Sequence, residues 1–460
     1  IRFIIMAGTR ALVFGSGLMV PCLVQNLLNR NFTVSVGGNI QEELARIAQK
    51  FQITTHTVDV TNIEQVASLL DEVDMVISMV PAKFHHFVVK ACIQKRKNMV
   101  TASYVSPEVK ALEQEIIDAG IVVLNEMGLD PGIDHMSVMR KVREIKHAGG
   151  QIVYFQSSCG GLPAPEACNN ILQYKISWAP YGALMAVLRP AKYLENNQIV
   201  EIQPQNLMST AQPLDLEYDL PLVYYPNGNS VNYVDLYGLH DAHTVKRCTI
   251  RYRNYPTICK GFVVLGIYNE ESFDFGENFS WRDLISHIAG DVNGDESLLG
   301  EIPDEMKPVA GKVAGKLNNF AADEVKLILE ALVKLDMLNT TPIRNAKSIF
   351  DAFVQLMQEK CKYEPGEEDL VIMEHRYIAQ YSDRKVLYKS KLIERGVVSE
   401  LSCMSRLVSL PASLGAYWLA THQHAPGLMY PMEEGFSEEI LSSLERDFNV
   451  KFEETEEVLN

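Results

Sequence analysis

The sequence predicts an α/β protein: a Rossmann-type doubly wound parallel sheet, a second mixed α/β domain and a small helical insertion. Three observations predict this fold class. Short apolar runs alternate with helical patterns from Arg10 to Leu124. A Gly-Ser-Gly turn, Gly15–Gly17, follows the first of these runs. From Glu271 to Lys362 the pattern becomes mainly helical.

Six strands and the helices between them account for the first part of the chain. Met75–Val80 is an unbroken apolar run, which is typical of a strand buried on both faces of a parallel sheet. The predicted strands are Arg10–Phe14, Phe32–Val36, Thr54–Val58, Met75–Val80, Met99–Ala102 and Ile121–Leu124. The predicted helices are Leu18–Leu28, Leu44–Phe51, Ile63–Leu70, Phe84–Gln94 and Val109–Ala119.

The rest of the chain has fewer periodic signals. Ile152–Ser157 is predicted to open the second sheet, which Asp369–Met373 and Val386–Lys389 are expected to rejoin. Leu401–Thr421 is predicted to be a helix. Two end segments are left outside the fold. We interpret Ile1–Ala7 as a leader or junction, and the acidic end, with Glu453, Glu454, Glu456 and Glu457, as a solvated tail.

Composition and charge exclude several function classes. The chain has 460 residues, with 42 Lys and Arg against 58 Asp and Glu, a net charge of −16. This balance argues against nucleic-acid binding, which needs clustered basic residues. No apolar run approaches the roughly 20 residues of a membrane span. The eight cysteines are scattered without a CxxC pair, so we predict no metal site, no disulfide framework and a reducing compartment.

The Gly-Ser-Gly turn predicts dinucleotide binding, because it ends the first strand and opens the first helix of a βαβ unit. The second strand ends in Gly37-Gly38-Asn39, which is neither acid nor base, so the choice between NAD and NADP stays open. Asp59, after the third strand, is expected beside the adenine. The predicted cofactor-binding residues are Gly15, Ser16, Gly17, Leu18, Met19, Asn39, Asp59, Val60, Val80, Pro81, Ser103, Leu129, Asp130 and Pro131.

The predicted dinucleotide site assigns a function to the first predicted domain. The dinucleotide-binding domain covers residues 1–126, and residues 422–460 are a segment that could return to it. The substrate domain covers residues 127–270 and 363–421, and the helical insertion covers residues 271–362.

Three segments rich in polar and turn residues carry the candidate chemistry: Thr101–Pro107, Asn125–His135 and Cys159–Glu166. Ligands of open α/β sheets bind at the carboxyl ends of the strands, where the first two segments lie. Tyr104 is either a proton-transferring phenol or a wall aromatic, and Asp130 is either functional or part of a turn.

Four further side chains are polar candidates, and two of them keep alternative interpretations. Cys159 either exposes a thiol to a site or is a buried structural cysteine. Asp134 is either functional or an N-cap of the following helix. The adjacent His85 and His86 would point in different directions on a helix, so a shared metal is not expected.

Together these segments resemble the glutamate-forming saccharopine dehydrogenase family. The resemblance covers essentially the chain from Thr9 onward, more loosely towards the C-terminus. It is carried by Gly15–Gly17 (GSG), Thr101–Pro107 (TASYVSP), Asn125–Met136 (NEMGLDPGIDHM), Cys159–Glu166 (CGGLPAPE), Tyr174-Lys175, Ser177-Trp178 and Thr249–Tyr252.

The resemblance implies an oxidoreductase of lysine metabolism that uses NAD or NADP. Its reaction interconverts saccharopine with L-glutamate and 2-aminoadipate 6-semialdehyde by hydride transfer. The family's catalytic residues fall on Tyr104, Asp130 and Cys159. Its substrate-binding residues fall on Ser103, Tyr104, Thr249, Ile250 and Arg251.

The partners and compartment follow from the same resemblance and from the composition. We expect a small amino-acid substrate, no nucleic acid, no membrane and a possible homodimer. We expect the cytoplasm, with the mitochondrial matrix as the alternative. Two alternative functions stay open: a same-fold dehydrogenase that acts on another secondary-amine amino acid, and a non-catalytic nucleotide-binding paralogue.

The chain departs from the family pattern at several positions. Gly228 replaces an arginine that grips a substrate carboxylate, Ser158 replaces a tyrosine, and Ala82 replaces an aromatic residue. A glycine-rich stretch is replaced by Arg395–Glu400. Losing one carboxylate-binding arginine could cost about 2 kcal/mol or more of binding. These departures fit either a shifted substrate or a weakened enzyme.

Overall fold

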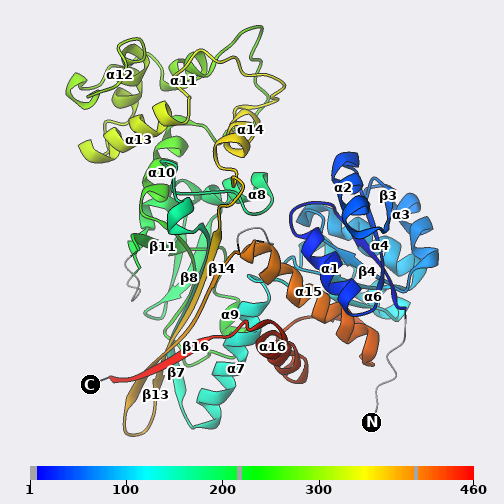
Figure 1. Cartoon of the computed structure of the whole chain (residues 1–460). Coiled ribbons are helices and arrows are strands. Elements are labelled where there is room, and N and C mark those ends of the chain that lie inside the picture. Colours follow the sequence, from blue (N-terminus) through cyan, green and yellow to red (C-terminus); the bar gives the residue numbers. More distant parts are fainter. Residues whose placement is uncertain (1–7, 215–219, 398–401, 460) are drawn as a thin grey trace. The chain divides into compact units, whose positions relative to one another are not determined.

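The computed structural model describes residues 8–214, 220–397 and 402–459, and the chain forms two compact units (Figure 1). The first unit comprises Ile1–Ile152, Ala379–Lys385 and Lys389–Asn460. The second comprises Val153–Ile378 and Val386–Tyr388. The predictions for Ile1–Ala7 and for residues 398–400 of the altered stretch lie outside the described residues.

A seven-stranded sheet organises the first unit, in the order β15-β6-β5-β4-β1-β2-β3. Every pairing in it is parallel. The strand order reverses between β1 and β4, which creates a crevice at their carboxyl ends. The predicted doubly wound fold is therefore confirmed. The strands are β1 (Arg10–Phe14), β2 (Thr33–Gly38), β3 (Thr54–Thr57), β4 (Met75–Ser78), β5 (Asn98–Thr101), β6 (Val122–Leu124) and β15 (Gly427–Met429).

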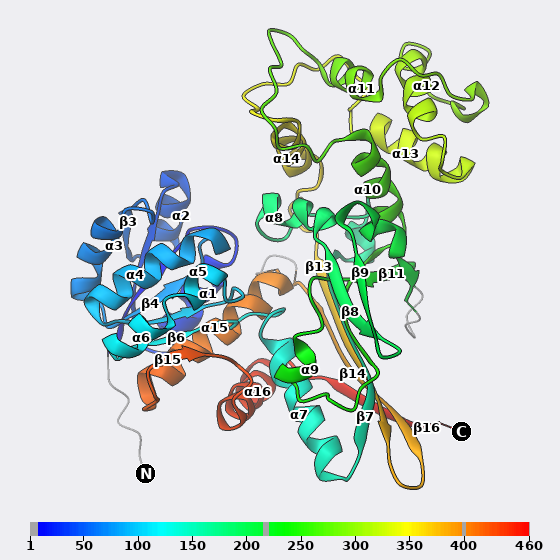
Figure 2. The same ribbon diagram turned by 180° about the vertical axis from the view of Figure 1, so that it is seen from behind.

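Helices cover the sheet of the first unit, and α15 packs against α1, as Figures 1 and 2 show. One predicted helix, Val109–Ala119, is wrong as a single element. It forms α5 and α6, separated at Ala111-Leu112, and Ser106 caps the first of them. The helices are α1 (Val20–Asn29), α2 (Gln41–Phe51), α3 (Ile63–Leu69), α4 (His85–Lys95), α5 (Pro107–Lys110), α6 (Glu113–Ala119), α7 (Ile133–His147), α15 (Cys403–Thr421) and α16 (Glu434–Phe448).

The second unit contains a mixed sheet with the neighbours β10-β11-β12-β7-β13. β12 is antiparallel to β11 and parallel to β7, so β12 lies between two strands that reach it from distant parts of the chain. The hairpin of β8 and β9 joins at the side of β12. The strands are β7 (Gln151–Pro163), β8 (Ala191–Glu195), β9 (Gln198–Ile202), β10 (Gln212–Pro213), β11 (Leu222–Pro226), β12 (Thr244–Tyr252) and β13 (Asp369–Gln380).

All the helices of the second unit except α9 (Tyr233–Leu236) contribute to one apolar core. The rings of Phe262 and Phe353 pack edge to face with their centres 5.7 Å apart, an arrangement that aromatic rings favour. Tyr174 and Tyr225 belong to the same core, so the helices pack directly on the residues beside the mixed sheet. The helices are α8 (Pro180–Met185), α9 (Tyr233–Leu236), α10 (Asn254–Leu265), α11 (Trp281–Ala289), α12 (Lys307–Lys316), α13 (Ala322–Lys334) and α14 (Ile349–Lys360).

Two segments have a different secondary structure from the one predicted. β7 continues to Pro163 instead of ending at Ser157, so Cys159 lies inside a strand. The acidic end is not a tail but β16 (Glu453–Leu459), which neighbours β14 (Lys385–Arg395). Glu454 accepts hydrogen bonds from Lys141 at 3.1 Å and Ser390 at 2.8 Å, which hold this exposed edge strand in place.

A helix that spans a membrane needs roughly 20 mainly apolar residues. Across residues 8–214, 220–397 and 402–459, no helix has both the length and the apolar character that crossing a lipid bilayer requires.

Candidate active site

The Gly-Ser-Gly turn joins β1 to α1 at the carboxyl edge of the sheet. Gly15 has φ +113°, and a Cβ there would lie 2.9 Å from the carbonyl oxygen of Met79. A Cβ on Gly17 would meet open space, so the backbone is accessible at that point. α1 then starts at Val20, whose amide donates to the Gly17 carbonyl at 3.0 Å, so the backbone open to a ligand is that of the turn itself. The turn therefore fits a pyrophosphate.

Helix α15 supports this turn from behind. The hydroxyl of Ser405 donates to the carbonyl of Leu18 at 3.0 Å, and the hydroxyl of Ser409 donates to that of Met19 at 2.8 Å. Ser409 is fully buried. Sequence reasoning missed both serines, because nearly four hundred residues separate each from its partner.

The expected adenosine side of the site lies at the ends of β2 and β3. The hydroxyl of Ser16 donates to Glu43 Oε2 at 2.6 Å, while Asn39 is exposed beyond β2. Asp59 instead accepts hydrogen bonds from the backbone and the hydroxyl of Thr61, at 2.9 and 2.7 Å. These bonds lower the pKa of the Asp59 carboxyl and make this exposed residue part of a local turn.

Tyr104 and Asp130 meet on loops that follow the neighbouring strands β5 and β6. The hydroxyl of Tyr104 donates to Asp130 Oδ1 at 2.7 Å. Backbone bonds join the two loops, from Glu126 to Ser103 at 3.1 Å and from Met127 to Thr101 at 3.0 Å. Tyr104 is 38% exposed, so the phenol is held at its tip and accessible along its side.

The remaining predicted cofactor residues of the first unit lie at the same edge. Val80 and Pro81 follow β4, and Leu129 and Pro131 flank Asp130. Leu18 and Pro81 are exposed, whereas Val80, Leu129 and Pro131 are buried. Val60 is half-buried beside Asp59.

Asp134 lies inside the first turn of α7, so its interpretation as the N-cap is wrong. The N-cap position belongs to Gly132, which has φ +144° and would force a Cβ to within 2.1 Å of the Gly128 carbonyl oxygen. The Asp134 carboxylate instead accepts the backbone N–H of Gly132 at 2.6 Å. This bond fixes the start of the helix immediately after the Asp130 loop.

A buried histidine connects the ends of two strands, β4 and β5, near Tyr104. Nδ1 of His85 lies 2.9 Å from the Ser78 hydroxyl, and Nε2 lies 2.8 Å from that of Ser103 and 3.3 Å from that of Thr101. Burial, with a smaller effect of His86, lowers the pKa of His85 to about 4. The neutral imidazole therefore positions the residue before Tyr104. The sequence offered His85 only as a doubtful metal ligand.

The predicted site residues of the second unit lie on two strands. Cys159, predicted to be catalytic, is on β7, and the predicted substrate residues Thr249, Ile250 and Arg251 are on β12. Cys159 and Thr249 are register partners on these parallel strands. Because side chains alternate along a strand, Thr249 and Arg251 share one face and Ile250 faces the other, fully buried. The Cys159 side chain is only 9% exposed, so the interpretation as an open thiol is wrong.

Arg251 is the buried cation of this group, 7% exposed. Its guanidinium carbon lies 5.2 Å from the ring centre of Tyr174 and 5.6 Å from that of Tyr255. Nη1 donates to the Ile250 carbonyl at 2.8 Å, while Nε is buried and has no hydrogen-bond partner among the described residues. A buried guanidinium with an unused donor is suited to an anionic ligand.

The departures from the family pattern occupy different environments. Gly228 follows β11 with φ +59°, and a Cβ there would meet nothing within 4 Å. Ser158 is buried and accepts a hydrogen bond from Gln156 at 3.2 Å. Ala82 begins a single helical turn before α4.

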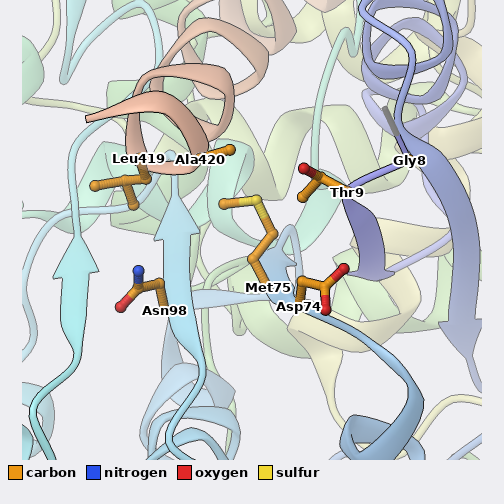
Figure 3. Close-up of a pocket in the computed structure, with 7 residues that line it drawn as sticks. All are labelled: Gly8, Thr9, Asp74, Met75, Asn98, Leu419 and Ala420. Carbon is orange, nitrogen blue, oxygen red and sulfur yellow. The ribbon is translucent and has the colours of Figure 1, made fainter. Parts of the chain in front are cut away.

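A cavity in the first unit lies at the opposite edge of the sheet (Figure 3). It opens at the amino ends of β1, β4 and β5, whereas dinucleotides bind at the carboxyl ends. It is therefore separate from the candidate active site. Its lining residues are Gly8, Thr9, Asp74, Met75, Asn98, Leu419 and Ala420. Within the described part of the chain, no group of three or more His, Cys, Asp or Glu side chains could hold a metal.

Comparison with known proteins agrees with this geometry. Residues 11–124 match the model of the saccharopine dehydrogenase NADP binding domain, and residues 128–449 match that of the saccharopine dehydrogenase C-terminal domain. The chain belongs to the saccharopine dehydrogenase family. The predicted family is confirmed, and so is the predicted use of a nicotinamide dinucleotide at the level of NAD(P).

Individual relatives show how far the similarity extends. The chain is 34% identical over 440 residues to the alpha-aminoadipic semialdehyde synthase, mitochondrial, of Bos taurus, covering 94% of this chain and 46% of that protein. The chain thus spans about half the length of the first curated relatives it matches.

Single-function relatives match over almost their whole length. The saccharopine dehydrogenase [NADP(+), L-glutamate-forming] of Saccharomyces cerevisiae is 30% identical, covering 97% of this chain and 99% of that protein. The solved structure of apo saccharopine dehydrogenase (L-Glu forming) from Saccharomyces cerevisiae has a TM-score of 0.85 at 29% identity. The match covers 98% of this chain and 100% of the solved chain.

Proposed function

We propose that this chain interconverts saccharopine with L-glutamate and 2-aminoadipate 6-semialdehyde by hydride transfer with NAD or NADP. The observation that carries this proposal is the 2.7 Å hydrogen bond between Tyr104 and Asp130, beside the crevice where a dinucleotide would bind. The names of the bovine and yeast relatives support the same reaction.

The dinucleotide would be held by the turn from Gly15 to Met19 and by the strand ends around Val80 and Leu129. When bound, its nicotinamide accepts a hydride from the substrate carbon that bears the secondary amine. The substrate becomes an imine, which water hydrolyses to glutamate and the semialdehyde. The amine must lose a proton as the imine forms, and a second proton transfer activates the water.

Tyr104 and Asp130 are suited to these proton transfers. The hydroxyl of Tyr104 donates to Asp130, so the carboxylate is the proton acceptor of the pair. Asp130 then serves as the general base, while the hydrogen bond orients the phenol toward the same region. His85, through Ser103, fixes the loop that carries Tyr104.

The residues proposed to bind the substrate are Ser103, Tyr104, Thr249, Ile250 and Arg251. Cys159 is proposed as a third catalytic residue, with Tyr104 and Asp130. Arg251 is the candidate for a carboxylate, because its buried Nε has no described partner. Ile250 would contribute its backbone, since its side chain is fully buried. Cys159 neighbours Thr249 in register and interacts electrostatically with Arg251.

Purified chain, incubated with saccharopine and either NAD or NADP, tests the proposal through the absorbance of the reduced nicotinamide. Glutamate and the semialdehyde should form in equal amounts with the reduced cofactor. Turnover only with another secondary-amine amino acid would replace saccharopine as the substrate. Cofactor binding without any turnover would support the non-catalytic alternative, for which the glycine at position 228 is the specific observation.

Arg251→Met checks the substrate assignment separately. We expect its KM for saccharopine to rise at least about tenfold while the dissociation constant of the cofactor stays the same. Arg251→Lys, which keeps the charge but not the planar fork, should recover only part of the loss.

Three further assignments are part of the proposal. The domains are a dinucleotide-binding domain at 1–126, with 422–460 returning to it, a substrate domain at 127–270 and 363–421, and a helical insertion at 271–362. The compartment is the cytoplasm, with the mitochondrial matrix as the alternative that the bovine relative's name supports. The assembly is a homodimer, which light scattering coupled to gel filtration would test.

A further inference from the structure

Three elements of the first unit converge where the adenosine ribose of a dinucleotide is expected. The turn after β1 contributes Ser16, whose hydroxyl donates to Glu43 Oε2 in the first turn of α2 at 2.6 Å. A Cβ on Gly38, at the end of β2, would lie 3.2 Å from that same hydroxyl. Ser16, Gly38 and Glu43 are therefore in one place, and both side chains are half-buried.

The end of the second strand decides between NAD and NADP in this fold. An acid there bonds the ribose 2′-hydroxyl, whereas an arginine accommodates the 2′-phosphate. The residues that directly follow β2, Asn39 and Ile40, carry no charge. The acid is supplied instead by Glu43, which lies on the following helix and reaches back to Ser16.

Cations that could accept a 2′-phosphate are scarce around this point. Residues 31–45 and 51–82 contain no Lys or Arg. Arg46 lies on α2, but its Nε donates to the backbone carbonyl of Glu42 at 3.3 Å on the exposed side of the helix. A phosphate next to the Glu43 carboxylate would thus meet a like charge without a placed counterion.

We propose that this chain selects NAD over NADP, and that Glu43 is the residue that determines this choice. Glu43 would accept a hydrogen bond from the ribose 2′-hydroxyl and repel a 2′-phosphate at the same position. Discrimination then has both an attractive and a repulsive part. This inference rests on the proposed function only in requiring a nicotinamide dinucleotide. It differs from the cofactor in the name of the yeast relative, NADP(+).

Direct binding measurements test the inference without turnover. Isothermal titration of the purified full chain with NAD and with NADP gives the two dissociation constants. We expect NAD to bind at least about tenfold more tightly than NADP, since a single unscreened like charge is enough for that ratio. Equal binding, or tighter binding of NADP, would overturn the inference.

Two variants of α2 test whether the selectivity between NAD and NADP depends on the Glu43 carboxylate. Glu43→Gln keeps the size of the side chain but removes the charge, so NADP should bind several-fold more tightly and NAD more weakly. Glu42→Gln removes an exposed charge in the same helical turn and should leave the ratio unchanged. An unchanged ratio in Glu43→Gln, or an equal change in Glu42→Gln, would remove Glu43 from the selection.

The outcomes also separate this inference from the proposed function. Binding of neither dinucleotide would overturn both. NAD selectivity in a chain that does not oxidise saccharopine would support the role of Glu43 and contradict only the proposed reaction.

Discussion

The hydroxyl of Tyr104 and the Oδ1 of Asp130 are joined by a 2.7 Å hydrogen bond. The two residues lie on separate loops, and backbone bonds between those loops at Ser103 and Thr101 hold the pair together. The bond therefore reflects the order of the strands, because only neighbouring strands β5 and β6 bring their carboxyl ends this close. A phenol and a carboxylate that share a proton form a unit, and the first prediction treats them as one.

Asp130→Asn and Tyr104→Phe should each lower kcat by roughly 100-fold or more, the usual range for losing acid–base assistance. The double variant should be little worse than Asp130→Asn alone, because the first change already disables the pair. Steady-state rates and cofactor titrations measure both effects, and the cofactor dissociation constant should stay within about twofold. Additive losses in the double variant would show that the two groups act separately.

His85 should make the stability of the first unit depend on pH. Its pKa in the folded chain, about 4, is below the ordinary histidine value of 6.5, so the unfolded chain binds a proton first as pH falls. Its contribution is complete above about pH 6.5 and is lost toward pH 4, by up to about 3 kcal/mol.

Urea unfolding of the wild type and His85→Gln across this pH window checks the effect. The variant should lose less stability on acidification, since it has no imidazole to protonate. For activity, Gln places an amide nitrogen near the Nε2 position and can still bond Ser103. Asn matches the Nδ1 position and reaches only Ser78. His85→Gln should therefore keep more of kcat than His85→Asn, and equal loss in both would contradict a positioning role through Ser103.

Gly228→Arg restores a family arginine and should lower the KM for saccharopine. The position has room, because nothing lies within 4 Å of a Cβ there. Its φ of +59° costs a non-glycine residue roughly 1 kcal/mol, so the gain in binding is offset in stability. Gly228→Gln carries the same backbone strain without the charge. A KM that falls equally in both variants would show that the charge is not responsible.

Ser405→Ala and Ser409→Ala should weaken cofactor binding from a distance. Each loses one hydrogen bond to the backbone of the Gly-Ser-Gly turn, worth about 1 kcal/mol or about fivefold in affinity. Ser402→Ala is a suitable control, because it removes the cap of the same helix without touching the turn. If that control weakens the cofactor as much as Ser409→Ala does, the serines act through the helix as a whole.

The sequence predicted the sheet of the first unit well because each strand and helix carries its own periodic signal. Met75–Val80 is apolar except for Ser78, and the structure buries Met75–Ser78 completely as β4. The seventh strand, Gly427–Met429, was missed because three residues carry no alternation and their partner, β6, lies far back in the chain.

The predictions for the acidic end and for the segment after Cys159 were wrong for related physical reasons. The acidic side chains of Glu453–Leu459 are exposed, so the sequence predicts a solvated tail. Backbone pairing beside β14 nevertheless makes this segment a strand. The two glycines after Cys159 suggest a turn, but a Cβ on Gly160 would lie 2.7 Å from the Ile250 carbonyl. Glycine is required there because two backbones approach closely.

The sequence predicted the site residues that belong to a recognisable motif. It missed those whose role depends on a contact with a distant part of the chain. Tyr104 and Asp130 were placed by their positions after strands. His85, Ser405 and Glu43 act through partners that are 18, 387 and 27 residues away. Hydrogen bonds over such separations depend on the folded chain and leave no local pattern.

The hydrogen bonds from α15 to the turn after β1 have a consequence for synthesis on the ribosome. Leu18 and Met19 leave the exit tunnel first, whereas Ser405 and Ser409 are synthesised 387 and 390 residues after their respective partners. The nascent chain can pair its first strands long before the turn receives its support. A ribosome-bound intermediate arrested before α15 should therefore retain nucleotide poorly, and full affinity should appear only when that helix has emerged.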